Sequence, residues 1–232
     1  MNRSFRPVRW IISLILLSSA SFSFAETPSR DLMQRLESIG TMTADFNQLV
    51  MDGDGQQMRE IAGRLKISRP GAFNWKTNDP FPQTIVSDGQ TLWIYDEDLE
   101  QVIVKQVDES LQESPAILIS GGVKDVEARF SVQRLMLPNG MVRFELTPKQ
   151  AAENSANISS GESLVKLALE FSNQGLQTMQ FQDALDQLTL VELMNVQLNP
   201  PLEPKWFSFK IPEGADVIDE RVDPAATITP SN

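Results

Sequence analysis

Arg69 is the residue of this sequence whose chemistry is hardest to place. Segment 61–76 alternates between apolar and polar side chains, and Arg69 falls in line with the apolar set, directly before Pro70 and four residues before Phe73. Such alternation is typical of a β-strand with one face toward an interior, where an unpaired guanidinium group is costly. Its N–H donors would then need acceptors, for example the free carbonyl groups at the end of a helix. Alternatively, the bend at 69–71 turns Arg69 outward, and the residues alone leave both orientations open.

Other residues that could do chemistry have simpler interpretations. The acidic cluster Asp96, Glu97, Asp98 and Glu100 could supply paired carboxylates for catalysis, but acids in a turn between strands are usually only solvated. The sequence DGDG at 52–55 has its glycines in the wrong places for a calcium loop and indicates a hairpin turn. The chain contains no His and no Cys, which excludes imidazole or thiolate catalysis and zinc sites built on those ligands. We therefore expect a protein that is not an enzyme and uses neither a metal nor a cofactor.

The N-terminus has the features of a secretory signal peptide. Arg3, Arg6 and Arg9 precede the apolar run IISLILLSSA, and a cleavage site of small residues ends at Ala25. We expect residues 1–25 to be removed on export. Their removal takes away three arginines and no acid, so the formal net charge changes from −11 to −14. An acidic chain of this kind is a poor candidate for binding nucleic acid.

The remaining pattern predicts mainly β-structure in one domain, 26–222, followed by a disordered tail, 223–232. Residues 28–40 predict a helix, with Ser29 as its N-cap and Gly40 just beyond its end. Alternating segments then predict consecutive antiparallel strands, including those at ARFSVQRLML, LVKLALEFS and LTLVELMNVQL and a last one at KWFSFKI. The segment SPAILIS is apolar all round, which predicts a short buried helical turn. Because a sheet must close or cover its faces, the two helical segments are candidates to cover its concave side.

Four stretches of the chain carry a family resemblance: KISRPGAFNWK, IVSDGQTLWIYDEDLEQV, SPAILIS and WFSFKIPEGADVIDE. In this order they resemble the periplasmic outer-membrane lipoprotein carriers (the LolA family), the soluble chaperones of the Lol pathway. The resemblance implies an incomplete antiparallel β-barrel, or half-barrel, with short α-helices that form a lid over an apolar concave cavity. It also implies that the cavity takes up the acyl chains of lipoproteins in the periplasm. The cargo would come from an inner-membrane ABC-type release complex and pass to an outer-membrane lipoprotein receptor.

The resemblance also implies roles for individual residues. Arg69 has the position associated with holding the lid closed by hydrogen bonds to the helical segments, and Phe73 the position associated with cargo transfer. The residues expected to line the cavity and the lid are Leu32, Leu36, Met42, Phe46, Leu65, Ile67, Trp75, Leu92, Ile94, Ile117, Leu118 and Ile119. We expect a monomer, because binding one cargo needs no symmetry. The alternative is a periplasmic sensor of the same fold, which would bind a lipid or lipoprotein without delivering it.

Overall fold

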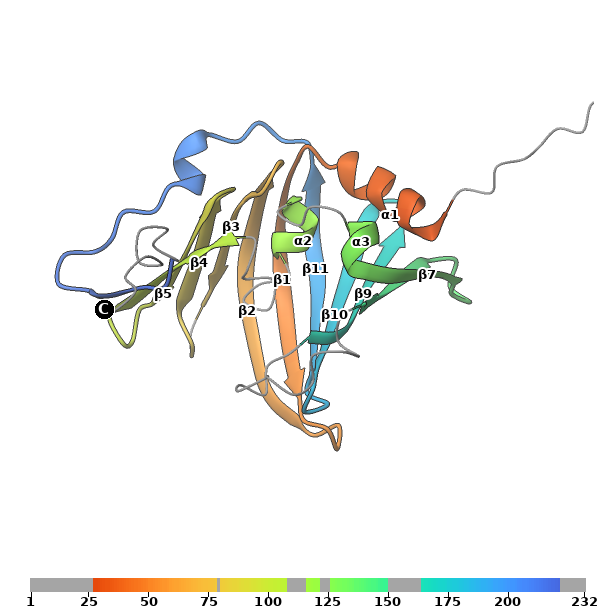
Figure 1. Ribbon diagram of the computed structural model, residues 1–232, viewed down its shortest axis with the longest axis horizontal. Helices are drawn as coiled ribbons and strands as arrows, with labels where there is room; N and C mark the ends of the chain where they lie inside the picture. The colour runs from red at the N-terminus through yellow and green to blue at the C-terminus, as the bar shows by residue number, and fades with distance from the viewer. Residues whose placement is uncertain (1–26, 79, 108–115, 122–125, 150–163, 222–232) are drawn as a thin grey trace, which may run out of the picture.

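The chain is organised around one large, curved β-sheet (Figure 1). The computed structural model describes residues 27–78, 80–107, 116–121, 126–149 and 164–221. The predicted signal peptide and the predicted tail 223–232 therefore lie outside the described residues. Among the helices that are described, none is long and apolar enough to cross a membrane.

Twelve strands form the sheet in the order β12-β6-β5-β4-β3-β2-β1-β11-β10-β9-β8-β7. The strands are β1 (Thr41–Met51), β2 (Gln57–Ser68), β3 (Ala72–Thr77), β4 (Gln83–Asp88), β5 (Thr91–Asp96), β6 (Gln101–Gln106), β7 (Phe130–Met136), β8 (Val142–Pro148), β9 (Leu164–Ser172), β10 (Gly175–Asp183), β11 (Leu188–Leu198) and β12 (Asp216–Asp219). Neighbouring strands are antiparallel, except that β12 runs parallel to β6. The edge strands β12 and β7 do not pair with each other, so the sheet stays open and the predicted half-barrel is confirmed.

The concave face of the sheet carries the apolar residues that alternate along the sequence. In β2, Ile61, Gly63, Leu65 and Ile67 are buried, whereas Ala62, Arg64 and Lys66, which alternate with them, are exposed or half-buried. Corresponding residues of the other strands join them in one continuous apolar core. Each large apolar side chain buried in this way contributes about 1.5–3 kcal/mol. Because the chain has no cysteine, its fold is stabilised by this packing and not by disulfides, which stabilise many exported domains.

Gly63 allows an aromatic ring to lie directly against the sheet. Phe46 of β1 faces Gly63 of β2, and its ring stacks on Trp75 with the ring centroids 4.0 Å apart. A Cβ atom at Gly63 would overlap both the Phe46 ring and the backbone oxygen of Lys76. A glycine within a strand usually weakens it, but here the ring occupies the space that a side chain would take.

Three helices lie across one half of the concave side (Figure 1). They are α1 (Pro28–Glu37), α2 (Ala116–Ser120) and α3 (Val126–Arg129). Helix α1 buries Leu32 and Leu36, and all five residues of α2 are buried. The apolar turn predicted from SPAILIS is therefore a helix that has no solvent-facing side.

The predicted first helix exists, but both predicted ends are wrong. Thr27, and not Ser29, is the N-cap, because Pro28 already occupies the first helical position and needs no hydrogen-bond acceptor for an N–H group. The helix ends before the C-cap residue Ser38, so Gly40 lies in the following loop instead of terminating the helix. The Gly40 N–H group donates to Asn199 Oδ1 at 2.8 Å, which ties this loop to the end of β11.

The strand predicted at ARFSVQRLML begins later than its pattern indicates. Its first residues, Ala128 and Arg129, belong to α3, and β7 begins at Phe130. Phe130 pairs with Pro148, the last residue of β8. The partner strand therefore ends where β7 begins, and residues before Phe130 have no strand beside them to pair with.

The prediction that KWFSFKI forms a strand is also wrong. Pro204–Phe207 form a 3-10 helix, η2, and the last strand is instead β12. Pro200, Pro201 and Pro204 lack N–H groups and cannot take part in a strand ladder. Residues 199–221, here called the strap, leave the sheet at the end of β11 and rejoin it beside β6 (Figure 1).

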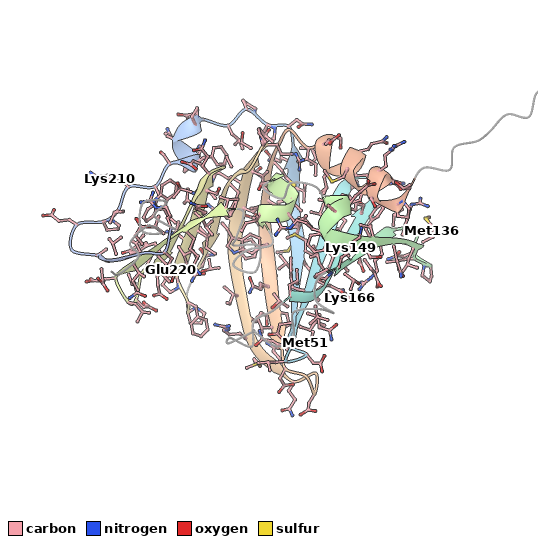
Figure 2. The ribbon with its side chains drawn as sticks, in the orientation of Figure 1. Met51, Met136, Lys149, Lys166, Lys210 and Glu220 are labelled. Carbon is pink, nitrogen blue, oxygen red and sulfur yellow. The ribbon has the colours of Figure 1, made fainter. Side chains whose placement is uncertain are left out.

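The strap covers outward-facing side chains of the sheet. Lys66 Nζ lies 4.3 Å from the centroid of the Trp206 ring, a cation–π distance. The Phe209 ring stacks on Trp93 with centroids 6.4 Å apart. Farther along, Lys210 and Glu220 mark the course of the strap in Figure 2, and Glu220 pairs with Lys105 of β6 at 3.3 Å. These contacts attach the strap on the side of the sheet opposite the helices.

A group of ion pairs lies on the outer face of β8 and β9. Arg143 Nη1 lies 2.6 Å from Glu170 Oε1, and Arg143 Nε lies 3.0 Å from Glu145 Oε1. Lys166, labelled in Figure 2, donates to the other Glu145 oxygen at 2.7 Å. Hydrogen bonding from Lys166 is the main reason that the pKa of Glu145 is below its ordinary value, with a further contribution from Arg143.

These contacts predict an acid-dependent contribution of Glu145 to stability. Because the folded pKa is below the unfolded one, the ionised group stabilises the protein above the unfolded pKa, and this stabilisation is lost as the pH falls through the folded pKa. Glu145→Gln should lower the free energy of unfolding at pH 7 by up to about 1 kcal/mol, and the difference from wild type should vanish in strong acid. Urea titrations at both pH values measure this. A loss that is the same in strong acid, or a similar pH-dependent loss in the exposed control Glu213→Gln, would contradict the assignment.

Candidate functional site

A cavity of about 590 Å³ opens on the concave side, toward the end of the sheet that the helices leave uncovered. Its apolar lining residues, here called the floor, include Ile61, Trp75, Ile85, Leu164 and Phe181. Its polar and charged lining residues, here called the rim, include Gln48, Arg59, Asp96, Asp98, Gln182, Asp183 and Gln187. Pockets for small-molecule ligands span roughly 300–1,000 Å³. The volume of the cavity therefore lies within the range of sites for one small ligand.

The predicted lining residues lie together, but mostly not around this cavity. All of them belong to the apolar core, and only Trp75 among them is also on the cavity floor. Leu32 and Leu36 of α1 and residues 117–119 of α2 are buried among the core side chains of the sheet. The helices thus fill their half of the concave face themselves. Ile61, Ile85 and Phe181 were missed by the prediction, although Ile61 belongs to the same alternating set as Leu65.

The Arg69 guanidinium group reaches the lid helix α2. Arg69 Nη1 donates to the carbonyl oxygen of Ile119 at 2.7 Å, and the Arg69 backbone N–H donates to Gly40 O at 2.9 Å. Of the two orientations that the sequence left open, the structure has the one in which helix carbonyls accept from Arg69. Burial lowers the pKa of Arg69, and the carboxylate of Glu37 acts in the opposite direction. An arginine remains charged in such a setting, so this hydrogen bond is charge-assisted.

Each of the last four carbonyl groups of α2 has a partner. Ile117 O accepts from Ser120 Oγ at 3.1 Å, and Leu118 O accepts from Gly121 N at 3.1 Å. The next two accept from the turn between β2 and β3: Ile119 O from Arg69, and Ser120 O from the Gly71 N–H at 2.6 Å. A buried helix end without such partners would be costly. One turn therefore holds the end of α2 with both a side chain and a backbone group.

Phe73 and the acidic cluster occupy different surroundings. Phe73 is fully buried on β3, opposite Ile67 of β2 and Ser87 of β4. Asp96 Oδ1 accepts from the backbone N–H groups of Asp98 and Leu99, each at 3.0 Å, which is the usual role of an aspartate in a turn. Asp96 and Asp98 also belong to the cavity rim, so the acidic turn borders the cavity.

Comparison with known proteins identifies the family. The family model described as "Outer membrane lipoprotein carrier protein LolA" matches residues 37–210. An outer-membrane lipoprotein carrier protein from Hahella chejuensis is 38% identical over 212 residues, covering 90% of this chain and 97% of that protein. The corresponding protein from Azotobacter vinelandii is 36% identical over 215 residues, covering 90% of this chain and 99% of that protein.

The solved structures that match this chain are more distant in sequence. A LolA superfamily protein from Nitrosomonas europaea has a TM-score of 0.46 at 13% identity, covering 80% of this chain and 99% of that one. An uncharacterised conserved protein from Thermus thermophilus has a TM-score of 0.49 at 11% identity, covering 84% of this chain and 100% of that one. The sequence relatives and the family match over three quarters of the chain carry the assignment: this protein belongs to the LolA family of outer-membrane lipoprotein carrier proteins.

Proposed function

We propose that this protein is a periplasmic chaperone that binds the acyl chains of lipoproteins and delivers them to the outer membrane. The observation that carries the proposal is α2, a fully buried helix whose residues are apolar except for the terminal Ser120, and which one turn of the sheet holds over an apolar concave core. If such a helix moves away from the core, its apolar side chains are exposed to water, which is unfavourable. An acyl chain that binds between the helix and the sheet would bury them again. The names of the relatives point to the same cargo.

The size of the cavity bears on how cargo would enter. A cavity of about 590 Å³ suits one ligand of ordinary size, whereas a lipoprotein carries several long acyl chains. We infer that the helices move off the core when cargo binds, which exposes Leu32, Leu36 and residues 117–119 to the acyl chains. The predicted lining residues would then line the loaded cavity, although they are packed against one another in the closed form.

The energy of closure explains how such a carrier can unload. Burying a methylene contributes about 0.8 kcal/mol, so about 40 methylenes would contribute about 30 kcal/mol. Non-covalent affinities saturate near about 20 kcal/mol, and cargo bound that tightly would not be released. Opening the lid breaks the bonds from Arg69 and Gly71 and exposes α2, so closure of the empty carrier offsets part of the cargo affinity. Arg69 acts in this scheme as a latch of the closed state.

The remaining expectations belong to the same proposal. Residues 1–25 act as a cleaved signal peptide, and residues 26–222 form one carrier domain that works as a monomer. The carrier receives cargo from an inner-membrane ABC-type lipoprotein release complex and passes it to an outer-membrane lipoprotein receptor. It performs no catalysis, because its task is one of binding and release.

A release assay tests the proposal. The protein from Glu26 onward is added to spheroplasts that hold a labelled outer-membrane lipoprotein, with and without ATP depletion. A soluble one-to-one complex that forms only with ATP, and that delivers its lipoprotein to outer-membrane vesicles, is the expected result. Lipoprotein that is bound but never delivered would identify a sensor instead. If no lipoprotein is released while a carrier from a close relative succeeds in the same spheroplasts, the proposal is wrong.

Phe73 is expected to affect transfer more than loading. A charged replacement would unfold a fully buried site, so the informative change is Phe73→Leu, which keeps an apolar side chain. Because Phe73 lies two residues beyond Gly71, on the strand that follows the turn holding α2, we expect normal loading and several-fold slower delivery to outer-membrane vesicles. Phe144→Leu, at an equally buried site on β8, is the matched control for the loss of an aromatic ring. Equal delivery by both variants and the wild type would exclude a transfer role.

A further inference from the structure

The turn that holds the lid is itself held by a neighbouring turn. Residues 69–71 connect β2 to β3, and residues 89–90 connect β4 to β5. Gly71 and Gly89 have φ angles of +81° and +96°, a backbone conformation that residues other than glycine rarely adopt. A Cβ at Gly71 would lie 2.9 Å from the Gly89 Cα, and a Cβ at Gly89 would lie 3.1 Å from Pro70 O. The two turns are thus in direct backbone contact.

Ser87 links these turns by hydrogen bonds. Its hydroxyl donates to Gly71 O at 2.9 Å and accepts from the Gly89 N–H at 3.0 Å. Ser87 is fully buried, so water cannot replace either bond. The carbonyl of Gly71 therefore has a fixed direction. On the other side of the same residue, the Gly71 N–H donates to Ser120 O of α2 at 2.6 Å.

We propose that Gly71 and Ser87 form a second contact that keeps the lid closed, separate from Arg69, and we call each such contact a catch. In this second catch the Gly71 N–H group bonds to α2, and Ser87 is the positioning residue. The Arg69 bond can break by rotation of one long side chain. The Gly71 bond breaks only if the turn or the helix moves as a whole, and Ser87 opposes movement of the turn. The two catches donate hydrogen bonds to adjacent carbonyl oxygens of α2, Ile119 O and Ser120 O. This inference rests on the proposed function, in which α2 leaves the core when cargo enters.

Replacement of Arg69 and replacement of Ser87 should affect the closed lid in different ways. Loss of Arg69 leaves the backbone catch in place, so the lid of Arg69→Leu remains partly held. Loss of Ser87 leaves the Arg69 bond but frees the Gly71 carbonyl and removes the link to Gly89. Full release of the helix end requires that both be lost. A double variant should therefore open far more than either single variant.

Thiol labelling measures lid opening without any lipoprotein. Because the chain has no cysteine, a single thiol introduced by Leu118→Cys, at a buried position of α2, reports only on that helix. A second protein with Leu176→Cys, buried on β10, reports opening of the sheet. Each serves as the background for Ser87→Ala, Arg69→Leu and the double variant, and modification by iodoacetamide is followed under native conditions.

Ser87→Ala should speed labelling in the Leu118→Cys background about tenfold, which corresponds to loss of one net hydrogen bond. Labelling in the Leu176→Cys background should change less than about twofold. The matched control is Ser120→Ala, which removes another fully buried hydroxyl but one that bonds within its own helix, to Ile117 O. Ser120→Ala should have a much smaller effect than Ser87→Ala.

Two results would overturn the second catch. One is unchanged labelling of the lid thiol in Ser87→Ala, and the other is equal acceleration at the lid and the sheet, which indicates general loss of stability. Amide exchange at Gly71 gives an independent reading, because it should accelerate in Ser87→Ala and not in Ser120→Ala. Neither measurement involves cargo, so a carrier that fails the release assay can still show the catch, and the two failures are distinguishable.

Discussion

Arg69→Leu is expected to bind lipoprotein at least as tightly as the wild type and to deliver it roughly 10- to 100-fold more slowly. The reason is the hydrogen bond from Arg69 Nη1 to Ile119 O, which the proposed movement of α2 off the core would break. A hydrogen bond involving a charged group contributes about 1.5–3 kcal/mol, and each 1.4 kcal/mol is about tenfold in an equilibrium. Without this bond the empty closed carrier is less stable, so unloading loses part of its driving force. Delivery to outer-membrane vesicles and the affinity for a purified lipoprotein measure the two effects.

Comparison with other arginine and lysine variants makes the test specific. Arg64→Leu is the matched control, because Arg64 lies on β2, five residues before Arg69, but is exposed, and it pairs with Asp45 at 3.4 Å. It should load and deliver normally. Arg69→Lys keeps a charge but loses the planar guanidinium fork, so an intermediate rate is expected. Normal delivery by Arg69→Leu would show that the bond to Ile119 O does not act as a latch.

Gly63→Ala is expected to destabilise the protein by about 3 kcal/mol, a large effect for the addition of one methyl group. The new Cβ would overlap the Phe46 ring and the Lys76 backbone oxygen. A side chain can rotate away, but a backbone oxygen in a central pair of strands moves only if the strand shifts. Displacement of the ring would also disturb its stacking on Trp75, which forms part of the cavity floor.

Urea unfolding and thermal unfolding measure this loss, and a decrease in the melting temperature of roughly 6–12 °C is expected for a domain of this size. The control is Gly53→Ala in the exposed turn between β1 and β2, where a Cβ would come no closer than 3.3 Å to its neighbours. That change should cost less than about 1 kcal/mol. If both variants are equally stable, the Phe46 ring can adopt another position, and its tight packing on Gly63 is not required for stability.

Most of the sheet could be predicted from the local sequence patterns. Strands such as β9, at LVKLALEFS, and β11, at LTLVELMNVQL, have the bounds that their patterns predict. Alternation is a local property, because successive side chains of a strand point to opposite faces whatever lies beside it. It also identified Leu65, Ile67 and Trp75 as inward-facing, and the uniform apolarity of SPAILIS predicted a buried helix. The four motifs then pointed to the family that the comparisons establish.

Features that depend on residues far apart in the chain could be seen only in the tertiary structure. KWFSFKI alternates like a strand, but the neighbouring prolines prevent pairing and its aromatic rings pack on Lys66 and Trp93 across the sheet. The strand predicted from Ala128 starts at Phe130 because β8 ends opposite it.

The orientation of Arg69 was open for the same reason. Its acceptor, Ile119 O, is 50 residues away in the chain. Gly71 and Ser87 are ordinary turn and strand residues in the sequence, and only the contact between their two turns joins them to the lid. A local pattern specifies which way a side chain points within its own strand. Which backbone groups it meets depends on how the strands and helices assemble.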